Sequence, residues 1–244
     1  MVNLVYAELV KLKRAKMFLV SLIGAAAAPI MIFIGFLDMK AKKPDEPALF
    51  SEAFSEVNLY VLLLIGTLLY GVITAYLYHR EYAEDTLKNL LTIPVSRISL
   101  IASKLILLFL WILTLTFVAW GLTLFFGLIG QFEGLSSTVL LESLKQFMLG
   151  GCLLFLLSTP TIFVTFLFKN YVPTIIFTSM ITMGNVALAN REYKVLFPWS
   201  AAHTIVTNGF VPEFPPYYSY IAILITSIVG LVATIIYFKK ADIQ

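Results

Sequence analysis

Long apolar stretches alternate with short polar connections along the whole of this 244-residue chain. A helix crosses a bilayer with about 20 consecutive apolar residues, because each residue adds about 1.5 Å along the helix axis. Six stretches meet this requirement, and no alternating strand pattern competes with them. The sequence therefore predicts an all-α, polytopic membrane protein, a single transmembrane domain over residues 1–244. The six predicted spans are residues 17–37, 57–78, 105–129, 146–168, 172–188 and 220–238.

The composition excludes several other classes of protein. Apolar and aromatic residues make up 60% of the chain and charged residues only 13%, whereas a soluble domain has about 25% charged residues. One cysteine excludes an internal disulfide, and two histidines are too few for the common metal motifs. The phosphate-binding loop Gly-x-x-x-x-Gly-Lys-Ser/Thr is absent, as are the common hydrolase motifs. We therefore expect no catalytic residue, no metal and, with a net charge of +3, no nucleic-acid partner.

The distribution of lysine and arginine predicts the orientation in the membrane. Six spans place both termini on one side. If that side is the cytoplasm, 11 of the 17 basic residues lie inside, whereas 9 of the 14 acidic residues lie outside. Cytoplasmic loops carry the excess of positive charge, so we expect both termini in the cytoplasm. The alternative is a cleaved secretory signal ending near residues 25–28, but the apolar run continues beyond Pro29.

Residues 1–16 have the pattern of an amphipathic helix. Apolar residues recur at helical spacing, opposite a polar face that contains Glu8 and three basic residues. This pattern is typical of a helix that lies in the membrane interface. The alternative is an extension of the first span. The basic residues of this predicted interface helix are Lys11, Lys13 and Arg14.

Residues 79–99 form the most polar stretch of the chain and connect the second and third spans. Asp85 or Thr86 can cap a short helix, and Pro94 ends it. Lys104 follows and is expected to extend its ammonium group to the membrane edge. Because both flanks of this loop are membrane spans, a soluble partner that binds the loop would move the two spans together. The alternative is a solvated connector.

Residues 190–219, before the last span, contain four prolines and many aromatic residues. The segment is too apolar for a free loop and too interrupted for a span. We expect short extracellular re-entrant or interfacial helices, one of them beginning at Pro198 and ending at Asn208-Gly209. Irregular backbone is tolerated at membrane depth only where protein covers it. The alternative is an aromatic belt that anchors the last span.

The predicted spans contain no clear unpaired charge, which argues against a proton-coupled pump and a charge-selective channel. They do contain hydroxyl and amide side chains, which commonly link helices through hydrogen bonds. Such side chains, together with aromatic residues, would also suit an amphipathic cargo. The candidate pathway residues are Asn58, Tyr70, Thr74, Asn185 and Trp199.

The loop after the second span resembles that of the ABC-2 type transporter permeases. The pattern in that family is Glu, then Gly-Thr, two Leu, Pro and Ser-Arg, followed by Lys. Here Asp85 replaces the usual Gly, and residues 197–199, Phe-Pro-Trp, also look like the family. The topology is similar over the whole chain, and the motif covers about 25 residues. The matching positions are Glu81, Thr86, Leu90, Leu91, Pro94, Ser96, Arg97 and Lys104.

The resemblance implies a membrane subunit of an ATP-driven exporter in the bacterial plasma membrane. Two permeases, identical or related, would pair, and two ABC ATP-binding subunits would supply the ATP and Mg. This chain would then hold no cofactor and no ATPase site. The most similar permeases export bacitracin, lantibiotics or other amphipathic peptides, in export or self-immunity.

Alternative functions are export of a lipid-like or drug-like compound, and an ATP-independent secondary transporter or pore. Carried over from the family, residues 79–99 would form the ATPase-coupling loop, and residues 190–219 the outer re-entrant helices. The residues implied in coupling are Glu81, Tyr82, Glu84, Asp85, Thr86, Leu87, Lys88, Leu90 and Leu91.

Overall fold

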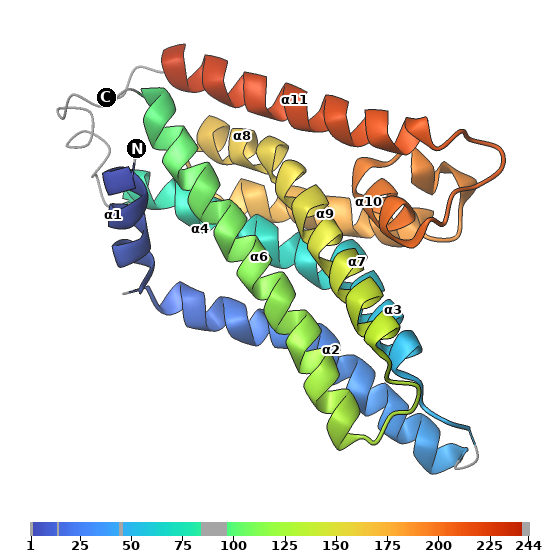
Figure 1. Ribbon diagram of the computed structural model, residues 1–244. Coiled ribbons are helices and arrows are strands. Elements are labelled where there is room, and N and C mark those ends of the chain that lie inside the picture. The colour runs from blue at the N-terminus through green and yellow to red at the C-terminus, as the bar shows by residue number, and fades with distance from the viewer. Residues whose placement is uncertain (1, 14, 44–45, 84–96, 241–244) are drawn as a thin grey trace.

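The computed structural model describes residues 2–13, 15–43, 46–83 and 97–240, which are almost entirely helical (Figure 1). One isolated bridge, between Leu49 and Glu133, is the sole extended pairing within these residues. The element order begins with α1 (Val2–Lys13), α2 (Lys16–Lys42), α3 (Phe50–Tyr60), the π-helical turn η1 (Val61–Ile65), α4 (Gly66–Ala83) and α6 (Arg97–Ile129). It continues with α7 (Ser137–Leu156), α8 (Ser158–Phe168), α9 (Tyr171–Leu188), the 3-10 turn η2 (Glu192–Val195), α10 (Pro198–Thr207) and α11 (Tyr217–Lys240).

Six helical stretches are long and apolar enough to cross a membrane, which confirms the predicted fold class. Each predicted span lies inside one of them, but most of the helices are longer than the apolar runs. The second stretch begins at Phe50 rather than at residue 57, because Phe50 and Phe54 are buried against α6 and α7. The six stretches are Lys16–Lys42, Phe50–Arg80, Ile98–Ile129, Ser137–Phe168, Tyr171–Leu188 and Tyr217–Lys240.

Two of these stretches are interrupted. The second stretch consists of α3 and α4 joined by the π-helical turn η1. The fourth stretch consists of α7 and α8, which meet at Leu157. Pro160, in the first turn of α8, has no backbone N–H to donate to the end of α7, which explains the break.

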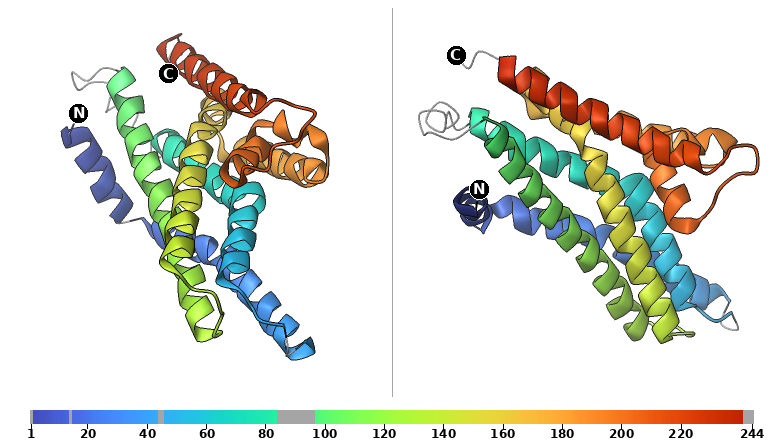
Figure 2. Two further views of the ribbon diagram at one scale, coloured as in Figure 1. Left: turned by 45° about the vertical axis from the view of Figure 1, so that its right-hand side comes forward. Right: turned by 45° about the horizontal axis from the view of Figure 1, so that its top comes forward.

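The amphipathic segment forms a separate helix. α1 ends at Lys13 and α2 begins at Lys16. The right-hand view of Figure 2 shows α1 nearly end-on while α2 runs across the picture. α1 packs mainly on α6. α1 is therefore a separate helix. The alternative interpretation, a continuous extension of the first span, does not hold.

The segment before the last span contains the helix expected from its sequence. α10 starts with Pro198 in its first turn and ends at Asn208, whose left-handed backbone has a φ of 52°. The backbone N–H of Gly209 donates to the carbonyl of Thr204 at 3.0 Å, which closes the helix end. α10 packs against α7, α11 and η1, and most of its side chains are buried. Figure 1 shows it at the end of the molecule away from α1.

Candidate functional site

The ends of four helices meet at one end of the molecule. Figure 1 shows α1, the end of α4, the start of α6 and the end of α11 together there. Glu81 and Tyr82 belong to the last turn of α4. The other predicted coupling residues lie outside the described residues; they are Glu84, Asp85, Thr86, Leu87, Lys88, Leu90 and Leu91. The structure therefore places the two helices that flank the coupling segment, and the roles of its residues stay predictions.

A buried ion pair joins three of these helices. The Lys104 ammonium of α6 donates to Glu8 Oε2 of α1 at 3.3 Å and to the Leu77 carbonyl of α4 at 3.1 Å. The two charged side chains are only 9% and 10% exposed. Lys11 Nζ donates to the other carboxylate oxygen of Glu8 at 3.1 Å. The expectation that Lys104 extends to the membrane edge is wrong, because its charge is neutralised by a carboxylate inside the protein.

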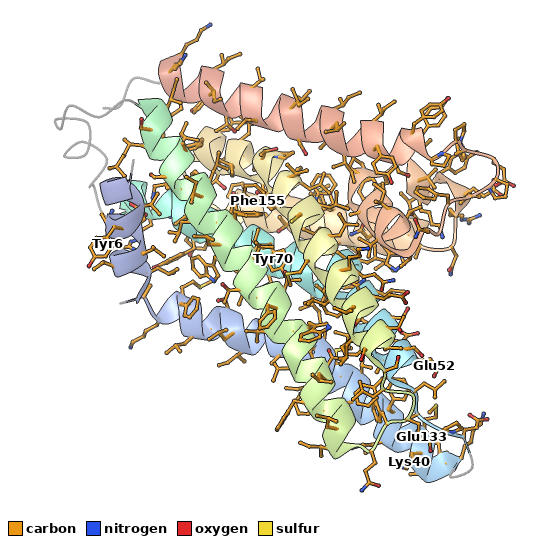
Figure 3. All side chains as sticks on the ribbon, in the orientation of Figure 1. Tyr6, Lys40, Glu52, Tyr70, Glu133 and Phe155 are labelled. Atoms are coloured by element: carbon orange, nitrogen blue, oxygen red, sulfur yellow. The ribbon has the colours of Figure 1, made fainter. Side chains whose placement is uncertain are left out.

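Glu8 and Leu9 depart from the two faces of α1 that the sequence pattern indicates, whereas Leu4, Val5 and Leu12 are buried or half-buried as an apolar face would be. Glu8 and Leu12, one turn apart, are buried, whereas Tyr6 is 69% exposed and Leu9 41%. Figure 3 shows Tyr6 on the outer side of α1. One signal could have identified Glu8: it is the only acidic residue among the first 37. An isolated acidic residue in a basic segment suggests a specific charged partner, and here that partner is Lys104.

The three basic residues predicted for the interface helix are not equally well placed. Lys11 is half-buried beside Glu8. Lys13 is the last residue of α1, and its side chain lies outside the described part, as does all of Arg14. Their contact with a membrane surface stays a prediction.

The interior of the helical body is lined by hydroxyl groups. Tyr70 lies near its centre (Figure 3), and its hydroxyl is 2.9 Å from that of Thr116. Tyr70 and Trp199 line one small cavity of about 10 Å³, together with Thr67, Thr161 and Thr178. That volume holds about one water molecule. Of the candidate pathway residues, the structure therefore brings Tyr70 and Trp199 together, in a space far smaller than a peptide.

Asn185 ties α9 to two other elements. Its side-chain amide donates to the Leu63 carbonyl at 2.8 Å, and its oxygen accepts from the Ser200 hydroxyl of α10 at 2.9 Å. Leu63 lies in η1, where a π-helical turn disturbs the regular carbonyl partners. A second carbonyl of this turn, that of Leu62, accepts from Thr67 Oγ1 at 2.8 Å. Asn185 thus stabilises the interruption in the second stretch.

The two remaining candidate pathway residues lie on either side of η1. The Thr74 hydroxyl donates to the Tyr70 carbonyl of its own helix at 2.7 Å. Asn58 is 1% exposed, and neither its amide nitrogen nor its oxygen has a hydrogen-bond partner among the described residues. A pathway role for all five residues stays a prediction.

Two larger hollows were not predicted from the sequence. A polar pocket of about 230 Å³ lies between α3, α7 and the end of α10, at the end away from α1. An apolar groove of about 320 Å³ lies between α1, α2 and α6. The pocket is lined by Ser51, Phe54, Ser55, Val139, Glu142, Ser143, Gln146 and Thr207. The groove is lined by Leu9, Leu12, Phe18, Leu107, Leu110, Trp111 and Thr114.

No group of three or more His, Cys, Asp or Glu side chains is arranged for a metal ion in the part of the chain that the structure describes. His203 lies on α10. Burial and, to a smaller extent, the positive charge of Lys194 together lower its pKa from 6.5 to about 4. The imidazole is therefore neutral at physiological pH.

The shifted pKa of His203 predicts a pH-dependent stability. The His203 imidazole binds a proton below about pH 6.5 in the unfolded state, but only below about pH 4 in the folded state. The contribution of His203 to the free energy of unfolding is therefore fully present above pH 6.5 and decreases as the pH falls below that value. We expect His203 to remove about 2 kcal/mol from the free energy of unfolding between pH 7.5 and pH 5. Thermal unfolding in detergent at both pH values measures this loss, and His203→Gln should reduce it. An equal loss in His203→Gln would contradict the assignment.

Comparison with known proteins identifies the family. Residues 4–185, about three quarters of the chain, match the family model described as ABC-2 family transporter protein. The chain belongs to the ABC-2 family. The matched part of this ABC-2 permease includes Glu8, Leu77 and Lys104 and ends before α10. The resemblance seen in the loop is thereby confirmed.

A relative of this ABC-2 permease covers most of its length. The chain is 66% identical over 205 residues to the bacitracin transport permease protein BCRB of Bacillus licheniformis. The alignment includes 84% of this chain and 99% of that protein. The permease is thus a multi-pass membrane protein of a transporter family whose members work with an ABC ATP-binding subunit.

Proposed function

We propose that this permease is the membrane subunit of an ATP-driven exporter of amphipathic peptides in the bacterial plasma membrane. The observation that carries the proposal is the 66% identity over 99% of a relative named as a bacitracin transport permease. At that identity the surfaces that contact cargo are expected to be largely shared. Bacitracin is therefore the first cargo to test.

In this proposal the chain supplies the pathway and its partner supplies the chemistry. Two permeases pair, and two ATPase subunits bind ATP and Mg on the cytoplasmic side. The sequence supports this division because it contains no phosphate-binding loop. The orientation has both termini in the cytoplasm. Support for it comes from the helix ends that share one end of the molecule. They are α1, the end of α4, the start of α6, and the end of α11 with Lys239 and Lys240.

The proposed ATPase contact is the coupling segment between α4 and α6. Glu81, Glu84 and Lys88 would make polar contacts, and Leu87, Leu90 and Leu91 would pack in a groove of the ATPase. When ATP closes the two ATPase subunits, this segment would move, and α4 and α6 would move with it because both helices are continuous with it. The pathway between the two permeases would then open outward.

Affinity purification of the tagged permease from a bacterial host in mild detergent tests this function. We expect a stoichiometric ATPase with a phosphate-binding loop to copurify, and expression to protect cells against bacitracin. Glu81→Ala and Glu84→Lys should each lower protection about tenfold, which corresponds to roughly 1.4 kcal/mol lost at the ATPase contact. Membrane insertion should be unchanged in both variants.

Glu213→Lys is the matched control, because Glu213 is an exposed acid in the segment before α11, away from α1. The Glu213→Lys variant should copurify with the ATPase and protect cells against bacitracin as well as the wild type does. Recovery of the permease without an ATPase in several detergents would contradict the proposal and favour a secondary transporter or pore. Full protection in both coupling variants would contradict the coupling segment alone.

A further inference from the structure

Lys104 occupies a position from which it can connect three helices. It lies in the second turn of α6, seven residues after the helix begins. Leu77, whose carbonyl accepts from Lys104, lies six residues before the end of α4. Glu8 brings α1 to the same ammonium group. The ion pair therefore sits beside the points where α4 and α6 enter and leave the coupling segment.

Burial makes this ion pair costly. Lys104 belongs to a candidate membrane span and is 7% exposed, and Glu8 is 8% exposed. Removing two charges from water is unfavourable, and this cost can exceed the attraction between the two ions. An apolar pair of similar volume would often be at least as stable. Ionisable groups inside membrane segments usually have a function, so stability alone is a poor explanation for this pair.

The ion pair is the charged part of the attachment of α1. Among the described side chains of α1, Glu8 and Leu12 are the two that are buried. Tyr6, Leu9 and Val10 are exposed. Without the ion pair, the buried Leu12 and the half-buried Leu4 and Val5 would hold α1, and such apolar contacts are non-directional and fix the orientation of a helix less tightly.

We propose that Glu8 and Lys104 are positioning residues that lock α1 to the ends of α4 and α6. When the ATPase displaces the coupling segment, the lock makes α1 move with both helices, and export requires this joint movement. This inference rests on the proposed function. Lys11 assists by holding the second carboxylate oxygen of Glu8 in place.

Four variants separate the lock from a merely structural role. Glu8→Gln and Lys104→Met each remove one charge of the buried pair and keep the other, so both should lower the thermal midpoint and export. The double variant Glu8→Gln/Lys104→Met has neither charge and should regain most of the stability. Its protection against bacitracin should nevertheless stay at least about fivefold below the wild type, with the ATPase still bound. Lys104→Arg, which keeps the charge and the donors, is the matched control and should export.

A distance measurement on the permease alone gives a second readout. Nitroxide labels at Tyr6→Cys on α1 and Ile98→Cys on α6, both exposed sites, report the relation of the two helices. The background is Cys152→Ser, which removes the single native thiol. We expect a narrow distance distribution in the wild-type pair and a broad one in the Glu8→Gln/Lys104→Met double variant.

The outcomes distinguish the two proposals. If the wild type neither binds an ATPase nor protects against bacitracin, the proposed function is wrong, and the distance distributions still test the lock. If the wild type and the stable double variant protect cells equally against bacitracin, the proposed role of Glu8 and Lys104 is wrong and the proposed function stands. An unchanged distance distribution in the double variant also overturns the lock.

Discussion

Replacing Asn185 with leucine is expected to lower the free energy of unfolding by about 3 to 5 kcal/mol, because two buried polar groups lose their partners. The Leu63 carbonyl of η1 would lose its amide donor, and the Ser200 hydroxyl of α10 would lose its acceptor. Asn185 is fully buried, so water does not replace it. Thermal unfolding of the purified variant in detergent should show a midpoint about 10 °C lower than in the wild type.

Thr182→Val is the matched control for this prediction. Thr182 lies on the same helix and is also buried, but its hydroxyl donates to the Thr178 carbonyl one turn earlier in α9. Removing that bond should cost less than about 1 kcal/mol, because the carbonyl stays within the helix ladder. If Asn185→Leu were as stable as Thr182→Val but failed to export bacitracin, Asn185 would be a pathway residue rather than a structural one.

The membrane helices could be predicted because their signal is local. An apolar run of about 20 residues identifies a span without any knowledge of its neighbours. The two ends of α10 could also be predicted from local sequence. Pro198 favours the start of a helix, and Asn208-Gly209 favours a left-handed residue at its end. Helix lengths were underestimated at α2, which continues through Asp38 and Lys42, where the two side chains pair at 2.6 Å. Polar residues ended the apolar run there without ending the helix.

Two side-chain contacts that the sequence did not predict join residues far apart in the chain. Glu8 and Lys104 are 96 residues apart, and the Asn185 amide reaches a carbonyl 122 residues earlier. An amphipathic pattern shows that a helix has two faces, but it does not show that Glu8 is buried by a partner on another helix. No proline marks the interruption at η1 in the sequence. The Asn185 amide that binds the Leu63 carbonyl of η1 lies on α9, which is beside α4 only in the folded protein. Residues 79–99 stood out locally as the most polar stretch of the chain, and their predicted role in coupling came from the resemblance to a family.

Gly230→Ala is expected to separate α8 from α11, which form the most extensive helix contact among the described elements. A Cβ at this position would lie 2.5 Å from the Pro160 nitrogen and 2.8 Å from the Thr159 carbonyl carbon. Both are backbone atoms, so a rotamer change cannot relieve the overlap and α11 must move outward. That movement would also break the 2.8 Å hydrogen bond from Thr159 Oγ1 to the Ser227 carbonyl. We expect a loss of about 3 kcal/mol.

The matched substitution Gly121→Ala should have the opposite sign. Gly121 lies inside α6, and a Cβ there would meet no atom within 4 Å. Alanine is favoured over glycine in a helix by about 1 kcal/mol, so this variant should unfold at the wild-type temperature or slightly above it. Thermal unfolding of both variants in one detergent is the measurement. Equal midpoints for Gly230→Ala and Gly121→Ala would show that α11 is free to shift, and that close packing on Pro160 does not hold the last span in place.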